Sequence, residues 1–285
     1  TNEIEKDLLK FSKERKMELI LPCLYSELEG TALPNIVEEI SKTKYLDHII
    51  VGLDKANEDQ AKKAWKFFKK LKTPFSILWN DGPQLKKLDQ ELKKKDLAPS
   101  ELGKGRNVWY CIGMSIARDT ARSVALHDCD IKTYDRRMLA KLFYPVVNPL
   151  FNFEFCKGYY PRVANNKMNG RVARLLVFPL LTALEKTIGK SDYIEFMKSF
   201  KYPLAGEFSF RRNVLPELRI SSDWGIEVGV LSEMQRNFSP NNICQVDLAD
   251  TYDHKHQELS IGDDKKGLSR MSTDIIKTLI RKLAT

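Results

Sequence analysis

Two aspartates that follow a short apolar run are the residues best suited to chemistry. The run 123–126 leads directly into His127-Asp128-Cys129-Asp130. Alternate residues of an extended segment point the same way, so Asp128 and Asp130 can share one ligand. Two close carboxylates repel unless a cation or a proton lies between them, and their hard oxygens suit Mg²⁺ or Mn²⁺. The spacing favours a divalent-cation site, with a strand that ends in an Asx turn as the alternative.

Two histidines near the C-terminus could complete such a site. His254 and His256 follow the run 243–250, which predicts a strand. Imidazole is a common metal ligand, although a histidine pair at a strand end is more often structural or exposed. Three of the four histidines of the chain lie in the segments 127–130 and 251–256, which favours a shared site.

Glycines next to cations mark three candidate contacts for anions. Lys104 lies in the Gly-Lys-Gly-Arg run 103–106 before a predicted helix, and Arg171 follows Gly170 at another predicted helix start. Glycine lets a ligand approach the backbone, and a helix N-terminus attracts anions. The spacing is not that of a Walker A motif. Lys157 is a third candidate, with a surface charge as the alternative.

Two glutamates beside glycines are candidates for binding a sugar. Glu207 follows Gly206, and Glu227 lies two residues after Gly225 in a run that begins with Trp224. Carboxylates accept hydrogen bonds from sugar hydroxyls, and an indole offers an apolar face. Ordinary loop turns are the alternative for both segments.

Alternating strands and helices must position these residues. In the first half, apolar runs predict strands over 17–24, 48–54, 75–81 and 123–130, between helical patterns over 33–44, 58–72, 84–96 and 107–120. Uniformly apolar strands separated by helices indicate a mostly parallel sheet covered on both faces. Ligands bind beyond the carboxyl ends of such strands, which is where the two aspartates fall.

The second half predicts a less regular arrangement. Residues 204–218 predict a loop-rich segment, and the stripe 271–283 predicts an amphipathic helix. That helix can dock on the core or on a second copy of the chain, so a homodimer is one expectation. We also expect a helix over 138–150 broken by prolines, a strand over 151–160, a helix over 170–189 interrupted at Pro179, a helix over 224–238 and a strand over 243–250.

Composition excludes several classes of protein. The chain has 285 residues, of which 42% are hydrophobic, so it can bury a sizeable core. No apolar run approaches the roughly 20 residues that span a bilayer, and the charged start is unlike a signal peptide. Five cysteines without a CxxC pair predict free thiols in a reducing compartment. We therefore expect a cytoplasmic protein with no membrane partner.

The net charge of +9 favours anionic partners. In the lysine-rich stretch 61–72, Trp65, Phe68 and Leu71 fall at helical spacing, so the lysines predict a solvated helix face. The sustained basic–aromatic pattern of a nucleic-acid groove is absent. We expect phosphorylated small molecules and no nucleic acid, with a basic nucleic-acid-binding module as the non-enzyme alternative.

The order of the segments from about Met17 onward resembles the glucosyl-3-phosphoglycerate synthases, which are retaining glycosyltransferases with the GT-A fold. The run 170–184, followed by 205–208 and 225–229, is its most specific part. The resemblance implies one α/β domain over 1–285 with a Rossmann-like, mostly parallel sheet. A nucleotide-binding half would span 1–130, and a loop-rich acceptor-binding half with the C-terminal helix would span 131–285. The matching segments are LPCLYSELEG, HIIVGLD, GKGRNVW, LHDCD, FCKGYYPR, NGRVARLLVFPLL, LAGEF, DWGIEVGVL and DHKH.

The resemblance also implies a role for each candidate residue. Asp130, with Asp128 nearby, would hold Mg²⁺ or Mn²⁺ on the donor diphosphate, and His254 would complete the shell. The remaining residues fall into three groups: Pro22, Leu24, Glu27, Asp54, Asp128 and Lys104 at the nucleotide sugar; Lys104, Glu207 and Glu227 as catalytic residues around the transferred sugar; and Gly170, Arg171 and His256 at the acceptor.

The implied reaction is transfer of a hexose, expected to be glucose, from a nucleotide-diphosphate sugar to 3-phosphoglycerate or a related small anion. Two departures from the family pattern are Ala173 in place of threonine, which bears on the acceptor, and Tyr25-Ser26 in place of Asn-Glu, which bears on the base. UDP or GDP, glucose or mannose, and phosphoglycerate or glycerate all stay open. A nucleotidyltransferase, which shares the sheet and the metal carboxylates, is the enzymatic alternative.

Overall fold

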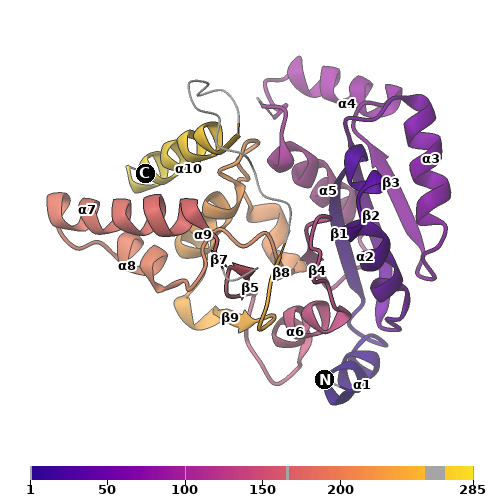
Figure 1. Ribbon diagram of the computed structural model, residues 1–285, viewed down its shortest axis with the longest axis horizontal. Helices are drawn as coiled ribbons and strands as arrows, with labels where there is room; N and C mark the ends of the chain where they lie inside the picture. Colours follow the sequence, from indigo (N-terminus) through magenta and orange to yellow (C-terminus); the bar gives the residue numbers. More distant parts are fainter. Residues whose placement is uncertain (1, 100, 165–166, 254–266, 285) are drawn as a thin grey trace.

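A seven-stranded sheet forms the centre of the computed structural model, which describes residues 2–99, 101–164, 167–253 and 267–284. The strand order is β3-β2-β1-β4-β8-β5-β9 (Figure 1). A separate two-stranded ribbon joins β6 to β7. The strands are β1 (Met17–Leu24), β2 (Leu46–Asp54), β3 (Phe75–Trp79), β4 (Ser123–Leu126), β5 (Phe155–Tyr159), β6 (Val163–Ala164), β7 (Lys167–Met168), β8 (Phe208–Arg211) and β9 (Ile243–Asp247).

Helices cover both faces of this sheet (Figure 1). Short turns η1 (Tyr25–Glu29), η3 (Arg212–Glu217) and η4 (Pro240–Asn242) are 3₁₀-helical, and η2 (Ala173–Val177) is π-helical. The α-helices are α1 (Asn2–Phe11), α2 (Ala32–Ser41), α3 (Glu58–Phe68), α4 (Pro83–Lys93), α5 (Lys104–Arg118), α6 (Arg136–Val147), α7 (Phe178–Ile188), α8 (Asp192–Ser199), α9 (Ile226–Asn237) and α10 (Gly267–Leu283).

The first half of the sheet is parallel, as predicted. β1 pairs with β2 on one side and with β4 on the other, and β3 extends the sheet beyond β2. β4 ends at Leu126, four residues earlier than predicted. Asp128 and Asp130 therefore lie in the segment beyond the strand, at the edge where the carboxyl ends of β1 and β2 also meet.

The prediction of a loop-rich segment over 204–218 was wrong, because this segment contains strand β8. β8 lies between β4 and β5 and is antiparallel to both. Phe208 and Phe210 pack on Phe155 of β5, while the Ser209 hydroxyl donates to the Leu142 carbonyl. Four residues are too few for a periodic signal, so only pairing with two neighbours defines the strand.

Two further elements of the second half differ from the predictions. Helix α8 was not anticipated; Ser191 caps it by accepting a hydrogen bond from the Ile194 amide. The helix predicted over 170–189 is divided, as expected, near Pro179: the π-helical turn η2 precedes α7. A π-turn next to proline is consistent with the lost amide donor of that residue.

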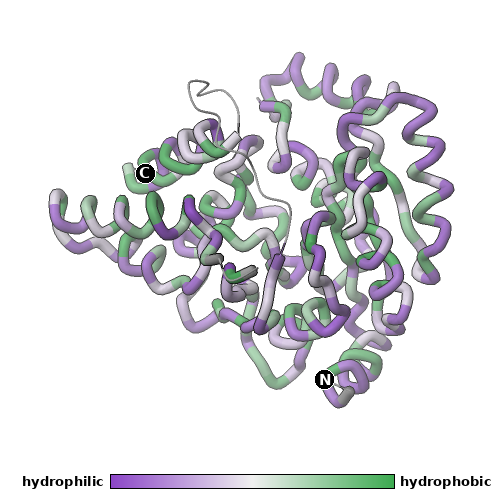
Figure 2. Tube along the Cα trace, viewed as in Figure 1, coloured by the Kyte–Doolittle hydropathy of each residue, from purple (hydrophilic) through white to green (hydrophobic). Residues whose placement is uncertain are grey.

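The hydrophobic core lies in two layers, one on each face of the sheet. Side chains from α2 and α6, such as Ile36 and Phe143, fill one layer. Side chains from α5, α8 and α9, such as Val108, Ile194 and Leu231, fill the other. Figure 2 shows the outer helices α3 and α4 as largely hydrophilic, in agreement with solvated lysine faces. Trp65 differs from the prediction, because it is 45% exposed while Phe68 is buried.

Candidate active site

A lysine bonded to two carboxylates is the centre of the candidate site. Lys104 Nζ lies 2.6 Å from Asp128 Oδ1 and 2.9 Å from Glu227 Oε1. Lys104 begins α5, Asp128 follows β4 and Glu227 lies in the first turn of α9. Burial by itself lowers the pKa of Lys104, but the two carboxylates outweigh burial and the pKa is raised. Lys104 is therefore a fixed positive charge that joins three distant segments.

Gly206 lets these charges approach each other. A Cβ at this position would lie 2.3 Å from Asp128 Oδ2 and 2.8 Å from Lys104 Nζ. Only a hydrogen fits in that space. The glycine that the sequence offered as part of a sugar site therefore has a packing role against the ion pair.

Glu207 is fully buried and is held by two tyrosines. Its Oε2 accepts a hydrogen bond from the Tyr160 hydroxyl at 2.8 Å, and its Oε1 accepts one from Tyr252 at 2.9 Å. The two rings stack with centroids 3.4 Å apart. Burial and the nearby Asp128 raise the pKa of Glu207. The arrangement fixes the carboxylate behind Gly206 and does not open it to solvent.

Lys157 is a buried cation, so the alternative of a surface charge was wrong. It has no exposed surface, and its Nζ donates to the Ala205 carbonyl at 2.5 Å. Burial lowers the pKa of Lys157 to about 8, although Glu227 and Glu207 oppose that shift. Through this hydrogen bond to Ala205, Lys157 fixes the position of the segment that carries Gly206 and Glu207.

The predicted nucleotide residues lie at the same edge of the sheet. Leu24 and Asp54 are partners in the β1–β2 register, and Pro22 pairs with Gly52. Burial, together with Asp81, raises the pKa of Asp54. Glu27 follows in η1. These four predicted residues therefore converge beside the strand ends.

The start of α5 differs from the prediction in two ways. The helix begins at Lys104, so the predicted start at 107 was wrong by one turn. The Arg106 amide donates to the Ser222 carbonyl at 3.1 Å, and a Cβ on Gly105 would lie 1.9 Å from the Ser221 carbonyl oxygen. Gly105 thus permits close approach of the 221–222 backbone, a packing need that is independent of any bound phosphate.

The described start of the second expected metal segment, residues 251–253, lies beside the first segment. The Lys132 amide donates to the Asp253 carbonyl at 2.8 Å, and the Asp253 amide donates to Thr133 Oγ1 at 3.1 Å. Lys132 is two residues after Asp130, and Asp253 directly precedes His254. His254 and His256 themselves lie outside the described residues. Within the described ranges no group of three His, Cys, Asp or Glu side chains forms a candidate metal cluster.

Of the predicted acceptor residues, Gly170 and Arg171 lie in the described part of the chain, just before η2, and His256 lies outside it. Arg171 is exposed, and Gly170 has a φ of +72°. A Cβ on Gly170 would touch Arg162 and Tyr202 at 3.3–3.4 Å. Arg162 in turn donates to the Tyr202 hydroxyl and lies over the Tyr252 ring. Gly170 is therefore connected to Glu207 through Arg162 and Tyr252, since Tyr252 donates to Glu207.

Sequence reasoning assigned no role to Arg162, Tyr160 or Tyr252. The first two lie in the segment FCKGYYPR of the family resemblance, and Tyr252 directly precedes the segment DHKH. Each lies within a few residues of a polar residue that was singled out. Aromatic residues next to such positions, just beyond a strand, are the signal that identifies them. The hydrogen bonds of Tyr160 and Tyr252 to Glu207, and the contact of Arg162 with the Tyr252 ring, depend on the tertiary structure.

Comparison with solved structures identifies the class of fold. The chain superposes on glucosyl-3-phosphoglycerate synthase of Mycobacterium tuberculosis in complex with Mn²⁺, UDP and glucosyl-3-phosphoglycerate, with a TM-score of 0.71. The sequences are 22% identical, and the match covers 98% of this chain and 84% of the other. The same protein with Mg²⁺ and UDP matches equally, also with a TM-score of 0.71. The chain thus has the fold of this relative, the GT-A fold.

Curated relatives identify the family. The chain is 45% identical over 282 residues to glucosyl-3-phosphoglycerate synthase of Persephonella marina. It is 40% identical over 270 residues to that of Methanococcoides burtonii. The match covers 99% of this chain and 70% of the first relative, and 94% of this chain and 66% of the second. The chain belongs to the glucosyl-3-phosphoglycerate synthase family. No protein-family model matches it.

Family membership supports an enzyme over the alternatives of a nucleotidyltransferase and a nucleic-acid-binding module. Within the described residues, no helix is both long and apolar enough to cross a membrane.

Proposed function

We propose that this chain transfers glucose from UDP-glucose to 3-phosphoglycerate with retention of anomeric configuration. The Mycobacterium tuberculosis relative has been solved with Mn²⁺, UDP-glucose and phosphoglyceric acid together. The observation that carries the proposal here is the contact of Lys104 with both Asp128 and Glu227 at the carboxyl edge of the sheet. This edge is where open α/β sheets bind their ligands.

The residues present fit a hard divalent cation. Mg²⁺ is usually held by one or two carboxylates together with waters and substrate phosphates, so it needs no large protein cage. Asp130, with Asp128 nearby and His254 as the third donor, would hold the ion. When bound, Mg²⁺ or Mn²⁺ neutralises charge on the donor diphosphate.

The protein side chains orient the donor and the transferred sugar. Pro22, Leu24, Glu27 and Asp54 line the nucleoside end of the site. Lys104 is held in one position by two carboxylates, so its charge is preorganised next to the leaving diphosphate. Glu227 accepts hydrogen bonds from the sugar hydroxyls. Glu207 is a positioning residue, because its burial between two tyrosines keeps it from the sugar itself.

The acceptor approaches from the second half of the chain. Arg171 binds its carboxylate or phosphate by paired hydrogen bonds, and Gly170 and His256 complete this side. The acceptor hydroxyl attacks the anomeric carbon on the face from which the diphosphate leaves, and a departing phosphate oxygen takes the proton. Residues 1–130 then form a nucleotide-binding half and residues 131–285 an acceptor-binding half. We also propose a cytoplasmic location, which the free cysteines favour.

The test is product formation from UDP-glucose and 3-phosphoglycerate with and without EDTA. We expect free UDP and glucosyl-3-phosphoglycerate with Mg²⁺ or Mn²⁺ present, and loss of turnover after chelation. Asp130→Ala and His254→Ala should lower activity and weaken its dependence on metal concentration. Release of pyrophosphate from a nucleoside triphosphate would indicate the nucleotidyltransferase instead. Equal turnover in EDTA would exclude the metal role.

The acceptor assignment has its own measurement. We would measure kcat/KM for each of the four pairs formed by two donors, UDP-glucose and GDP-mannose, and two acceptors, 3-phosphoglycerate and glycerate. The pair with the highest kcat/KM identifies the donor and the acceptor. Arg171→Ala should raise the acceptor KM and leave the donor KM unchanged. An unchanged acceptor KM would remove Arg171 from the acceptor site.

A further inference from the structure

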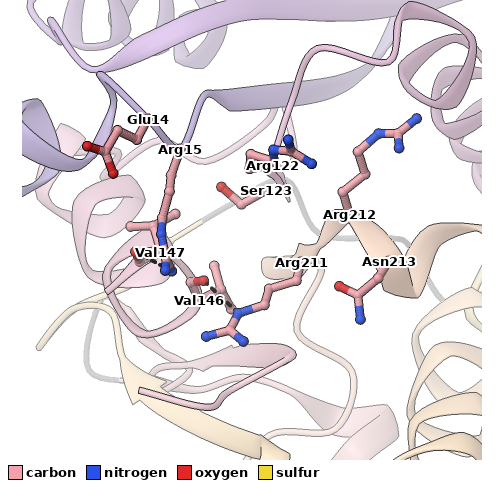
Figure 3. Close-up of a pocket in the computed structure, with 9 residues that line it drawn as sticks. All are labelled: Glu14, Arg15, Arg122, Ser123, Val146, Val147, Arg211, Arg212 and Asn213. Atoms are coloured by element: carbon pink, nitrogen blue, oxygen red, sulfur yellow. Dashed lines mark hydrogen bonds between the residues drawn. The ribbon is translucent and has the colours of Figure 1, made fainter. Parts of the chain in front are cut away.

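An arginine-lined cavity lies at the edge of the sheet opposite the candidate active site. Its volume is about 510 Å³ (Figure 3). Ser123, the first residue of β4, lies in its wall. Asp128 follows the other end of the same short strand, so the two sites are separated by the length of β4. The cavity is lined by Glu14, Arg15, Arg122, Ser123, Val146, Val147, Arg211, Arg212 and Asn213.

Backbone hydrogen bonds between three segments build this cavity. The Arg122 amide donates to the Lys16 carbonyl at 2.8 Å, and the Arg212 amide donates to the Arg122 carbonyl at 3.0 Å. Ser123 is the register partner of Arg211 across the β4–β8 pair. The loop after α1, the loop before β4 and the end of β8 are therefore fixed relative to one another, and the end of α6 closes the cavity.

The four guanidinium groups are compensated unequally. Arg211 pairs with Glu154 at 3.3 Å, and Arg212 pairs with Asp119 at 2.8 Å. Among the described residues, Arg15 makes one side-chain hydrogen bond, to the Val147 carbonyl at 3.1 Å. The exposed Arg122 side chain has no hydrogen-bond or ion-pair partner among the described residues. Arg15 and Arg122 thus have no carboxylate paired with them in the described part of the chain.

A buried hydroxyl in the same wall lacks a partner. Ser123 is 1% exposed, and its Oγ makes no hydrogen bond within the described part of the chain. In Figure 3 its side chain lies between Arg15 and Arg122. A buried hydroxyl without a partner is costly unless a ligand or a water satisfies it. Unpaired guanidinium groups around a free donor are the chemistry that recognises a phosphate.

We propose that this cavity is a second ligand site, distinct from the catalytic one, which binds the phosphate group of a small molecule. Arg15, Arg122 and the Ser123 hydroxyl donate to the phosphate oxygens, and Arg211 adds positive charge from the opposite wall. The volume exceeds that of a single phosphate ion and lies in the range of small-molecule sites. Glu14, the only carboxylate of the lining, opposes an anion and sets an upper limit on affinity.

The experiment is a titration of the ¹⁵N-labelled full chain with inorganic phosphate and, separately, with a hexose phosphate at constant ionic strength. Amide signals of Arg122 and Ser123 report on the cavity, and those of Lys104 and Gly206 report separately on the catalytic edge. We expect saturable shifts at Arg122 and Ser123 whether or not the catalytic signals move. Shifts with inorganic phosphate indicate the free ion as ligand, and shifts with hexose phosphate alone indicate an ester.

Variants make the assignment specific. Arg122→Gln should weaken binding at the cavity by about tenfold or more, the loss expected for one charge-assisted hydrogen bond. Ser123→Ala should weaken it by a smaller factor, and Glu14→Gln should tighten it. Arg219→Gln changes an exposed arginine outside the cavity and serves as the matched control. Equal affinity for Arg122→Gln and Arg219→Gln, or an absence of shifts at Arg122 and Ser123 with both ligands, would overturn the proposal.

Discussion

The two ends of strand β4 carry opposite kinds of electrostatic site. At the carboxyl end, Lys104 is balanced by Asp128 and Glu227 in contacts of 2.6 and 2.9 Å. At the amino end, Arg122 has no ion pair among the described residues, and the Ser123 hydroxyl has no hydrogen bond. At the carboxyl end the charge of the lysine is neutralised by carboxylates of the protein itself. At the amino end, the donors Arg122 and Ser123 have no acceptor oxygens among the described residues.

This difference indicates what each end needs from a ligand. A balanced ion pair holds its members in one geometry before a substrate arrives, which is the preorganisation that catalysis requires. Unbalanced donors gain most of their stabilisation from the ligand itself. Changes at the carboxyl end should therefore alter both the rate of turnover and the free energy of unfolding. Four predictions test that expectation.

The largest effect is expected for Lys104→Met. Removing the fixed charge next to the leaving diphosphate should lower kcat/KM by about 10²- to 10³-fold, as for other preorganised electrostatic groups. Initial rates of UDP release measure this change. Lys94→Met, an exposed lysine beside Glu91 at the end of α4, should retain wild-type rates. A tenfold or smaller loss for Lys104→Met would mean that the balanced pair is structural only.

The buried Lys157 predicts a pH-dependent stability. Its pKa is lowered from 10.5 to about 8 in the folded state, so the unfolded chain binds more protons between these values and stability rises with pH there. Relative to Lys157→Met, which cannot titrate, the wild type should gain up to about 3 kcal/mol from pH 8 to pH 10.5. Urea unfolding of both proteins at several pH values measures the difference. If the difference in unfolding free energy between the two proteins stays constant with pH, the lowered pKa of the buried Lys157 is wrong.

The close approach at Gly206 gives the third prediction. Gly206→Ala forces the Asp128 and Lys104 side chains apart, and overpacking of this kind costs about 1–3 kcal/mol. Turnover should fall as well, because the ion pair is displaced. Gly113→Ala is the matched control: a Cβ there meets nothing within 4 Å, so helix α5 should gain about 0.5–1 kcal/mol. Thermal unfolding of both variants separates the outcomes, and equal melting temperatures would refute the packing argument.

The smallest effect is expected for Tyr252→Phe. Loss of one hydrogen bond to the buried Glu207 should reduce the free energy of unfolding by about 1–2 kcal/mol. Tyr160 still donates to the other oxygen, so the carboxylate keeps one partner. The double variant with Tyr160→Phe should lose more than the sum of the single variants, because Glu207 is then buried without a donor. Simple additivity in urea unfolding would show that the tyrosines do not act as a pair.

Sequence reasoning was most successful where many residues repeat one signal. The parallel first half and the edge that carries Asp128 follow from long apolar strands separated by helices. It was least successful for β8, whose four residues carry no period, and for α8. Gly105 shows a subtler limit: the sequence suggested close backbone approach correctly, but the approaching group is the Ser221 carbonyl of the protein itself.

The sequence by itself determined the fold class, the family and the types of residue available for chemistry, because these depend on local pattern and order along the chain. Only the tertiary structure decided which charges meet. Lys104 and Glu227 are 123 residues apart, and Lys157 is buried although its neighbours in sequence do not require it. Pairing and burial depend on which surfaces the sheet brings together, and no local window of sequence contains that information.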